Sequence, residues 1–150
     1  MERVARCFEL YIISKRTKMN RKIALTGTVL LLISIILGAF GAHALKEILK
    51  EEQLISFETG VRYQMIHGLG LLILGLNANR HAFQLKTIFH LLLSGVVLFS
   101  VSIYFLALQD VLGMNLKFLG PITPLGGLLM ILGWSVYGFQ LFRSKSTHEL

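Results

Sequence analysis

"FETGVRYQMIHGLGLLILG", Phe57 to Gly75, is the stretch that decides the fold of this chain. It opens with charged and polar side chains and ends in a run, residues 68–75, that has none. The apolar segment that begins in it, Met65 to Leu76, contains one polar residue, His67, and is shorter than the roughly 20 residues that a transmembrane helix needs. Whether the stretch crosses a membrane therefore has to be decided from the rest of the chain.

The composition is that of a membrane protein. Of the 150 residues, 54% are hydrophobic and 15% are charged, whereas soluble domains have about 45–50% and about 25%. The single cysteine, Cys7, excludes an intramolecular disulfide. The net charge of +7 does not indicate nucleic-acid binding, because seven of the fifteen basic residues precede Ile23 and the apolar run that follows it. Such clustering is typical of a signal that orients a protein in the membrane.

Three further segments are long and apolar enough to cross a bilayer: Ile23–Leu45, Thr87–Leu108 and the slightly short Leu125–Phe142. A cleaved signal peptide is the alternative for the first, but the apolar region of signal peptides is only about 7–15 residues long. Before the last, Thr123 is predicted to cap the first free amides of the helix and Pro124 to lie in its first turn.

The distribution of Lys and Arg favours four crossings. With four, the N-terminus, the connection 77–86 and the C-terminal tail share one side, which holds eleven basic residues, and Lys46, Lys50 and Lys117 lie on the other. This bias predicts that both termini are cytoplasmic. If residues 57–75 did not cross, the bias would nearly vanish. The predicted spans are 23–45, 61–76, 87–108 and 125–142.

The predicted fold is all-α: an integral membrane four-helix bundle, residues 19–142, with an interfacial amphipathic helix between spans one and two. That helix is expected within Lys46–Gly60, where apolar residues alternate with charged ones. Residues 1–18 are expected to form a basic extension that is either disordered or dispensable, or is bound to the membrane surface as a helix. Residues 143–150 form a cytoplasmic tail.

Small residues at intervals of four and seven predict where the helices pack, because helices in lipid associate through close backbone approach. Each predicted span has one such stripe. The packing residues are Gly27, Ser34, Gly38 and Ala42; Gln64, Gly68 and Gly75; Gly95 and Ser102; and Gly126 and Gly133.

Polar residues in the outer half of span two form the candidate site. Glu58 and Arg62 share a helix face in the favourable order for an ion pair. Arg62 is expected to pair with Glu58, or to bind carbonyl groups at the end of span one. His67 is expected near mid-bilayer, roughly 14 Å from Leu76 at about 1.5 Å per residue. The full cluster, structural or involved in transport, is Glu58, Arg62, Tyr63, Gln64, His67 and His43.

The histidines leave three interpretations open. His67 is either a neutral imidazole bonded across the bundle, a proton relay, or a haem or metal ligand with His43. His43 and His67 form no ligand-spacing motif, and His90 and His148 do not complete one, so no metal or cofactor site is predicted. No nucleophile is paired with a base, so the chain is not expected to be an enzyme.

Four motifs occur in the order of a known family: "GAFGAHALK" (38–46), "FETGVRYQMIHGLGLL" (57–72), "LFSVSIYFLAL" (98–108) and "GPITPLGGLLMILGW" (120–134). Together they resemble the small bacterial membrane proteins called domain of unknown function 423, over about residues 19–142. Val101 stands where that family usually has glycine. The resemblance implies a four-span membrane protein and no assigned activity or ligand residues.

Three functions remain as hypotheses. The first is a structural or accessory protein of the bacterial cell membrane, whose partners are the lipid bilayer and either further copies of itself or other membrane proteins. The second is a small transporter or proton-coupled channel that uses a polar pocket in span two. The third is haem or metal binding through the membrane histidines. Nucleic acid is not expected as a partner.

Overall fold

The computed structural model describes residues 19–81, 83 and 85–144, and within these ranges the chain is helical with no strand. The predicted all-α class is therefore confirmed. The predicted extension, residues 1–18, lies outside the described residues, as do residues 145–150 of the predicted tail.

Helix α2 runs from Arg21 to Ala42. Asn20 caps it, since its side-chain oxygen accepts a hydrogen bond from the backbone N–H of Ile23 at 3.2 Å. The backbone N–H of Asn20 donates to the carbonyl of Gly75 at 2.8 Å. The start of α2 is thus tied to the end of the next long helix. The helix ends three residues before the predicted end of span one, and a 3-10 turn, η1 (Leu45–Glu47), then begins the chain reversal.

Helix α3 is continuous from Glu51 to Leu76. The backbone N–H of Lys50 donates to Oε1 of Gln53 at 3.1 Å, and Glu51 and Glu52 place negative charge at the positive end of the helix dipole. The interfacial helix predicted within residues 46–60 is not a separate element. Its place is taken by η1 and the first turns of α3, because no proline interrupts α3 and the helix continues through Gly60 into the apolar run.

After α3, the 3-10 turn η2 (Ala78–Arg80) leads to helix α4 (Lys86–Val96), the π-helical segment η3 (Val97–Val101) and α5 (Ser102–Leu112). The last three form one uninterrupted rod. The π turn inserts an extra residue into the rod without breaking it. The rod ends in a Schellman motif: Gly113 has φ +64°, and the N–H of Met114 donates to the carbonyl of Gln109 at 3.0 Å.

The 3-10 turn η4 (Lys117–Leu119) precedes helix α6 (Ile122–Arg143). Pro121, rather than Thr123, occupies the N-cap position, and no side chain caps this helix. The predicted cap was wrong because the helix starts two residues earlier than a cap at Thr123 requires. The hydroxyl of Thr123 instead lies 2.7 Å from that of Ser102 on α5.

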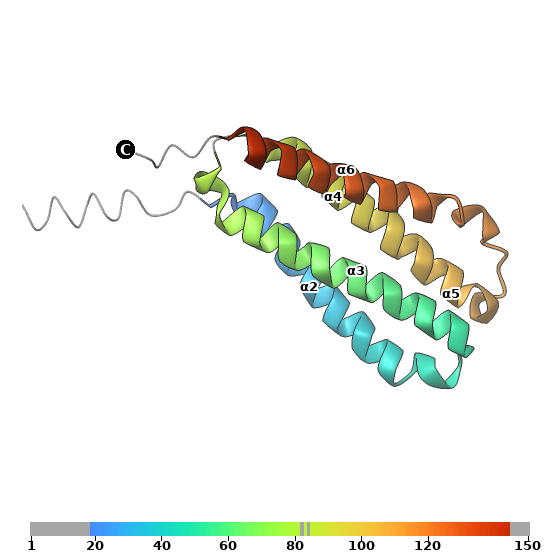
Figure 1. Ribbon diagram of the computed structural model, residues 1–150. Coiled ribbons are helices and arrows are strands. Elements are labelled where there is room, and N and C mark those ends of the chain that lie inside the picture. The colour runs from blue at the N-terminus through green and yellow to red at the C-terminus, as the bar shows by residue number, and fades with distance from the viewer. Residues whose placement is uncertain (1–18, 82, 84, 145–150) are drawn as a thin grey trace, which may run out of the picture.

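The helices are arranged as two antiparallel pairs, α2 with α3 and the α4–η3–α5 rod with α6 (Figure 1). Helix α3 packs against the rod along its length, so α3 has neighbours on both sides. Helices α2 and α6 lie on opposite sides of this central contact. From α6, Trp134 reaches across to α3, where its ring is 6.1 Å from that of His67.

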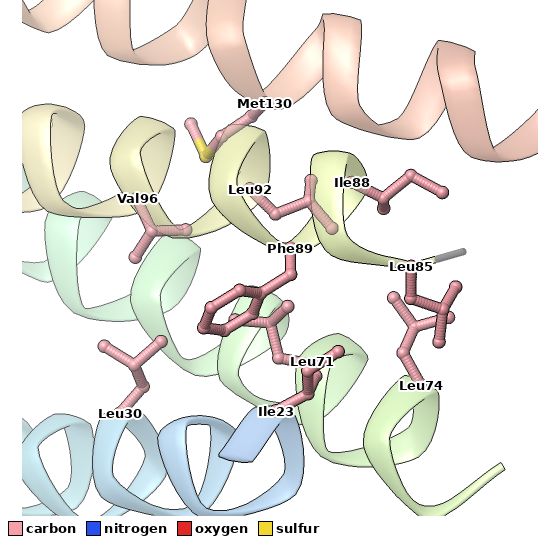
Figure 2. Packing of buried hydrophobic residues seen from close by; sticks show 10 residues of the cluster. All are labelled: Ile23, Leu30, Leu71, Leu74, Leu85, Ile88, Phe89, Leu92, Val96 and Met130. Atoms are coloured by element: carbon pink, nitrogen blue, oxygen red, sulfur yellow. The ribbon is translucent and has the colours of Figure 1, made fainter. Parts of the chain in front are cut away.

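Buried apolar side chains gather in two clusters. The larger joins α2, α3, α4 and α6; in Figure 2, Phe89 of α4 points toward Leu71 of α3 and Ile23 of α2, and Met130 lies on the other side of α4. The smaller cluster contains Phe57, Val61 and Ala107. Between the two clusters lie the buried polar residues of α3.

Three helical segments of the described chain are long and apolar enough to cross a membrane: Arg21–Glu47, Lys86–Leu112 and Lys117–Arg143. Helix α3 is not among them. Large apolar side chains are widely exposed on all the long helices, which is the surface that lipid rather than water would cover. The architecture is therefore all-helical with three long apolar helices.

Candidate functional site

Gln64 is the centre of the buried polar residues. It is 4% exposed, and its side chain lies between α2 and α5. Nε2 donates to the carbonyl of Leu30 at 3.1 Å, and Oε1 accepts from the hydroxyl of Tyr104 at 3.1 Å. A carbonyl can only accept, so the amide nitrogen must face Leu30. One side chain thus joins three helices through two hydrogen bonds.

Two buried serines lie near this amide. Ser34 Oγ donates to the same Leu30 carbonyl at 2.8 Å, and Ser100 Oγ in η3 donates to the carbonyl of Gly60 at 2.9 Å. The ring of Tyr104 packs on Phe57 with centroids 4.9 Å apart. We call Ser34, Gln64, Ser100 and Tyr104 the polar layer. All four side chains have hydrogen-bond partners. These bonds offset the cost of removing the polar groups from water, and none of the four side chains is left unpaired.

His67 lies one helical turn further along α3 and is 6% exposed. Its Nδ1 lies 2.8 Å from the carbonyl oxygen of Tyr63. Because that oxygen accepts, Nδ1 carries the proton, and a neutral ring then presents Nε2 as an acceptor. Within the described residues Nε2 has no hydrogen-bond partner. Protein atoms do not enclose it completely, so it can be reached from outside the fold.

A groove of about 500 Å³ lies beside His67. Its walls are mainly apolar and aromatic. The rings of Trp134, His67, Tyr63 and Phe99 follow one another along it, with successive centroids 6.1, 6.1 and 4.7 Å apart. The other lining residues are Gly127, Met130, Ile131 and Ser135.

Glu58 and Arg62 are exposed, and the ion pair expected between them is not formed. Arg62 also makes no hydrogen bond to a described residue, so it does not bind carbonyls at the end of α2. Both side chains lie on the outward face of α3, where no neighbouring helix fixes two long side chains against their rotamer entropy. The one ion pair among the described residues joins Lys50 Nζ to Asp110 Oδ2 at 3.1 Å.

The structure does not bring the two candidate histidine ligands together. His43 is exposed at the C-terminal end of α2, whereas His67 is buried among α3, η3 and α6. In the described parts of the chain, no three His, Cys, Asp or Glu side chains gather as metal ligands. His90 is also exposed, and His148 lies outside the described residues. Tyr63 is 41% exposed and forms part of the groove rather than of the polar layer.

Most of the predicted packing residues lie at close helix contacts, but Ala42 is exposed and Gly38 is not closely approached. A Cβ on Gly27 would meet the backbone of Leu72 and lie 2.6 Å from the oxygen of Gly68, and one on Gly75 would lie 2.7 Å from Cα of Ala24. In the other pair, a Cβ on Gly126 would lie 2.8 Å from the oxygen of Gly95. A Cβ on Gly133 would meet only side chains, at 2.7 Å or more, and Gly38 has room for one.

Sequence reasoning missed two members of the polar layer, Ser100 and Tyr104. Their spacing of four residues within a span was a usable signal, because it places two polar side chains on one helical face. The π turn that orients Ser100 toward α3 had no such signal, since local sequence does not predict an extra residue in a helical turn.

Comparison with known proteins gives the family. Residues 37–127 match the family described as "Protein of unknown function (DUF423)". The chain belongs to this family. A UPF0382 membrane protein of Staphylococcus epidermidis is 46% identical over 99 residues, covering 66% of this chain and 77% of the relative. No solved structure matches this chain.

Two other relatives of this DUF423 member extend the comparison. The UPF0382 membrane protein of Staphylococcus haemolyticus is 40% identical over 117 residues, covering 78% of this chain and 92% of its own. The UPF0382 membrane protein YwdK of Bacillus subtilis is 37% identical over 110 residues, covering 72% of this chain and 85% of the relative. The resemblance to the DUF423 family is thus confirmed, and the chain is a membrane protein of a family whose function is unknown.

Proposed function

We propose that this DUF423 protein is a structural or accessory protein of the bacterial cell membrane that crosses the bilayer four times. Helix α3 is the fourth crossing, together with the three long apolar segments. The observation that carries the proposal is the hydrogen bonding of Gln64 to both α2 and α5. A polar side chain closed off by protein groups holds helices together, whereas a transport pathway needs polar groups that reach water.

The position of α3 in the fold supports the fourth crossing. It is antiparallel to α2, and the N–H of Asn20 and the carbonyl of Gly75 join the paired ends. A helix so paired with an apolar span lies at the same depth as that span. The buried amide of Gln64 is then tolerated in the bilayer because it bonds to neighbouring helices rather than facing lipid.

Four crossings leave both termini on one side, and the eleven to three distribution of basic residues supports the cytoplasmic side. The partners that we propose are the lipid bilayer and either further copies of the chain or other membrane proteins. We propose no enzymatic activity.

A double-mutant cycle tests the structural role. Gln64→Leu and Tyr104→Phe remove the two ends of one hydrogen bond, and we expect a coupling energy of about 0.6 kcal/mol, typical of such bonds between membrane helices. Unfolding would be followed by titration with sodium dodecyl sulfate in mixed micelles. Tyr137→Phe is the matched control, because no described residue bonds to that hydroxyl. Equal coupling for Tyr104 and Tyr137 would contradict the proposal.

Reporter fusions test the topology. Green fluorescent protein fused after Leu150 should fluoresce, and alkaline phosphatase fused there should be inactive. Alkaline phosphatase inserted between Leu112 and Lys117 should be active. The opposite activity at either site would exclude the proposed orientation or the fourth crossing.

A further inference from the structure

We propose that the groove beside His67 binds the ring of a lipid-soluble hydroquinone, with Nε2 of His67 accepting a hydrogen bond from a ring hydroxyl. This proposal concerns a binding site and goes beyond the structural role of the polar layer.

The first argument is the hydrogen-bonding state of His67. Its side chain is nine-tenths buried, and its Nδ1–H is used by the carbonyl of Tyr63. Its other ring nitrogen, Nε2, has no hydrogen-bond partner among the described residues and is not completely covered by protein atoms. In hydrocarbon no water would satisfy it, and an unpaired polar atom there is costly. The missing partner must be a donor, because a neutral imidazole in this tautomer accepts at Nε2.

The second argument is the shape and chemistry of the walls. Four rings from three helical segments follow one another along the groove, and Met130 adds a polarizable thioether. Flat aromatic surfaces of this kind favour a flat ring by stacking. The volume of about 500 Å³ lies within the range of small-molecule sites.

The third argument is access. Ile131 lines the groove and is 64% exposed on α6, so the groove opens toward the surface that lipid covers. His67 lies nine residues before the end of α3, about 14 Å along the helix axis. A ligand would therefore arrive from within the bilayer and leave a hydrocarbon tail there. Lipid-soluble hydroquinones have these features: a flat ring, a hydroxyl group that donates a hydrogen bond, and a hydrocarbon tail.

Trp134 makes the test direct, because it is the only tryptophan of the chain and lines the groove. The protein in lipid nanodiscs would be titrated under argon at pH 8 with decyl-benzohydroquinone, and quenching of its fluorescence followed. The oxidised decyl-benzoquinone is the matched ligand, since it has the same size but no hydroxyl donor. Inner-filter effects would be corrected with N-acetyltryptophanamide.

We expect saturable quenching by the hydroquinone and at least tenfold weaker binding of the quinone. His67→Phe keeps an aromatic wall but removes the acceptor, so it should weaken hydroquinone binding about tenfold and leave quinone binding unchanged. His90→Phe, outside the groove, should change neither. Equal affinity for the two ligands, or no effect of His67→Phe, would overturn the proposal and leave an apolar groove that lipid chains fill.

A second variant covers the case in which His67→Phe does not fold. A Cβ on Gly127 would lie 3.8 Å from the ring of Phe99, an ordinary contact, so Gly127→Leu should fold and fill the groove. It should abolish saturable quenching by both ligands. Unchanged quenching in Gly127→Leu would place the ligand elsewhere and refute the site. The coupling of Gln64 with Tyr104 does not depend on either result.

Discussion

The α2–α3 pair and the α4–η3–α5 rod with α6 are both packed through glycines, yet they differ in what lies between the helices. Backbone meets backbone at Gly27 and Gly75 in the first pair and at Gly126 in the second. Among the described residues, the amide and imidazole side chains that are almost wholly buried, Gln64 and His67, both belong to α3, which has helical neighbours on both sides. A central helix can thus carry polar groups into a membrane protein, because its neighbours supply the hydrogen-bond partners that lipid lacks.

The largest expected effect is at the glycine contact of the first pair. Gly27→Val would place its branched side chain against the backbone of Leu72 and Gly68, which cannot rotate away. We expect it to lower the free energy of unfolding by about 3 kcal/mol, the upper end of usual overpacking costs. The loss would be measured by titration with sodium dodecyl sulfate. Gly138→Ala, which has no neighbour within 4 Å, should cause no loss. Similar losses in both variants would contradict this account of the interface.

The second pair allows a comparison of two glycines that meet different atoms. A Cβ on Gly126 would approach the backbone of Gly95 and Phe99, whereas one on Gly133 would meet the side chain of Leu92. A side chain can change rotamer and backbone cannot, so Gly126→Ala should cost about 1–2 kcal/mol and Gly133→Ala under about 1 kcal/mol. Thermal unfolding in detergent would rank the two variants. The reverse order would show that Leu92 is held more rigidly than its position suggests.

A smaller effect is expected where the two pairs meet. Ser100→Ala removes the hydrogen bond from η3 to the carbonyl of Gly60 without changing the side-chain volume much. We expect a loss of about 0.5–1.5 kcal/mol. Ser94→Ala is the control, because the hydroxyl of Ser94 is exposed and bonds within its own helix. If the two variants lost equal stability, the bond across the pairs would have no special role.

The smallest effect should come from the connection between the two pairs. Burial against Phe83 and Tyr137 lowers the pKa of His81 below its ordinary value. The unfolded chain then binds the proton more readily than the folded one, so stability is highest above about pH 6.5 and falls as the pH drops below it. His81→Gln should flatten this part of the curve of melting temperature against pH. If the curve did not change, the pH dependence of the melting temperature would come from other groups, and the prediction would be wrong.

Long apolar segments were predictable from the sequence because length and charge distribution reflect the bilayer itself. Close contacts at glycines were also suggested by spacing. The partners of the polar residues were not, because Gln64 bonds to groups 34 and 40 residues away. The Glu58–Arg62 pair shows the limit of local reasoning: a favourable spacing on one helix forms no bond where both side chains point away from the fold. Whether a residue faces a neighbour depends on packing that helical periodicity alone does not give.

The π turn at Val97–Val101 sets the phase of its rod. An α-helix advances about 100° per residue, so one extra residue rotates everything after it by about that angle relative to everything before it. Gly95 ahead of the turn faces α6, and Ala107 beyond it packs against Phe57 of α3. Deleting one residue from the turn would hardly shorten the rod. It would rotate the packing face of α5 relative to that of α4, so that the rod could pack against α6 or against α3 but not against both.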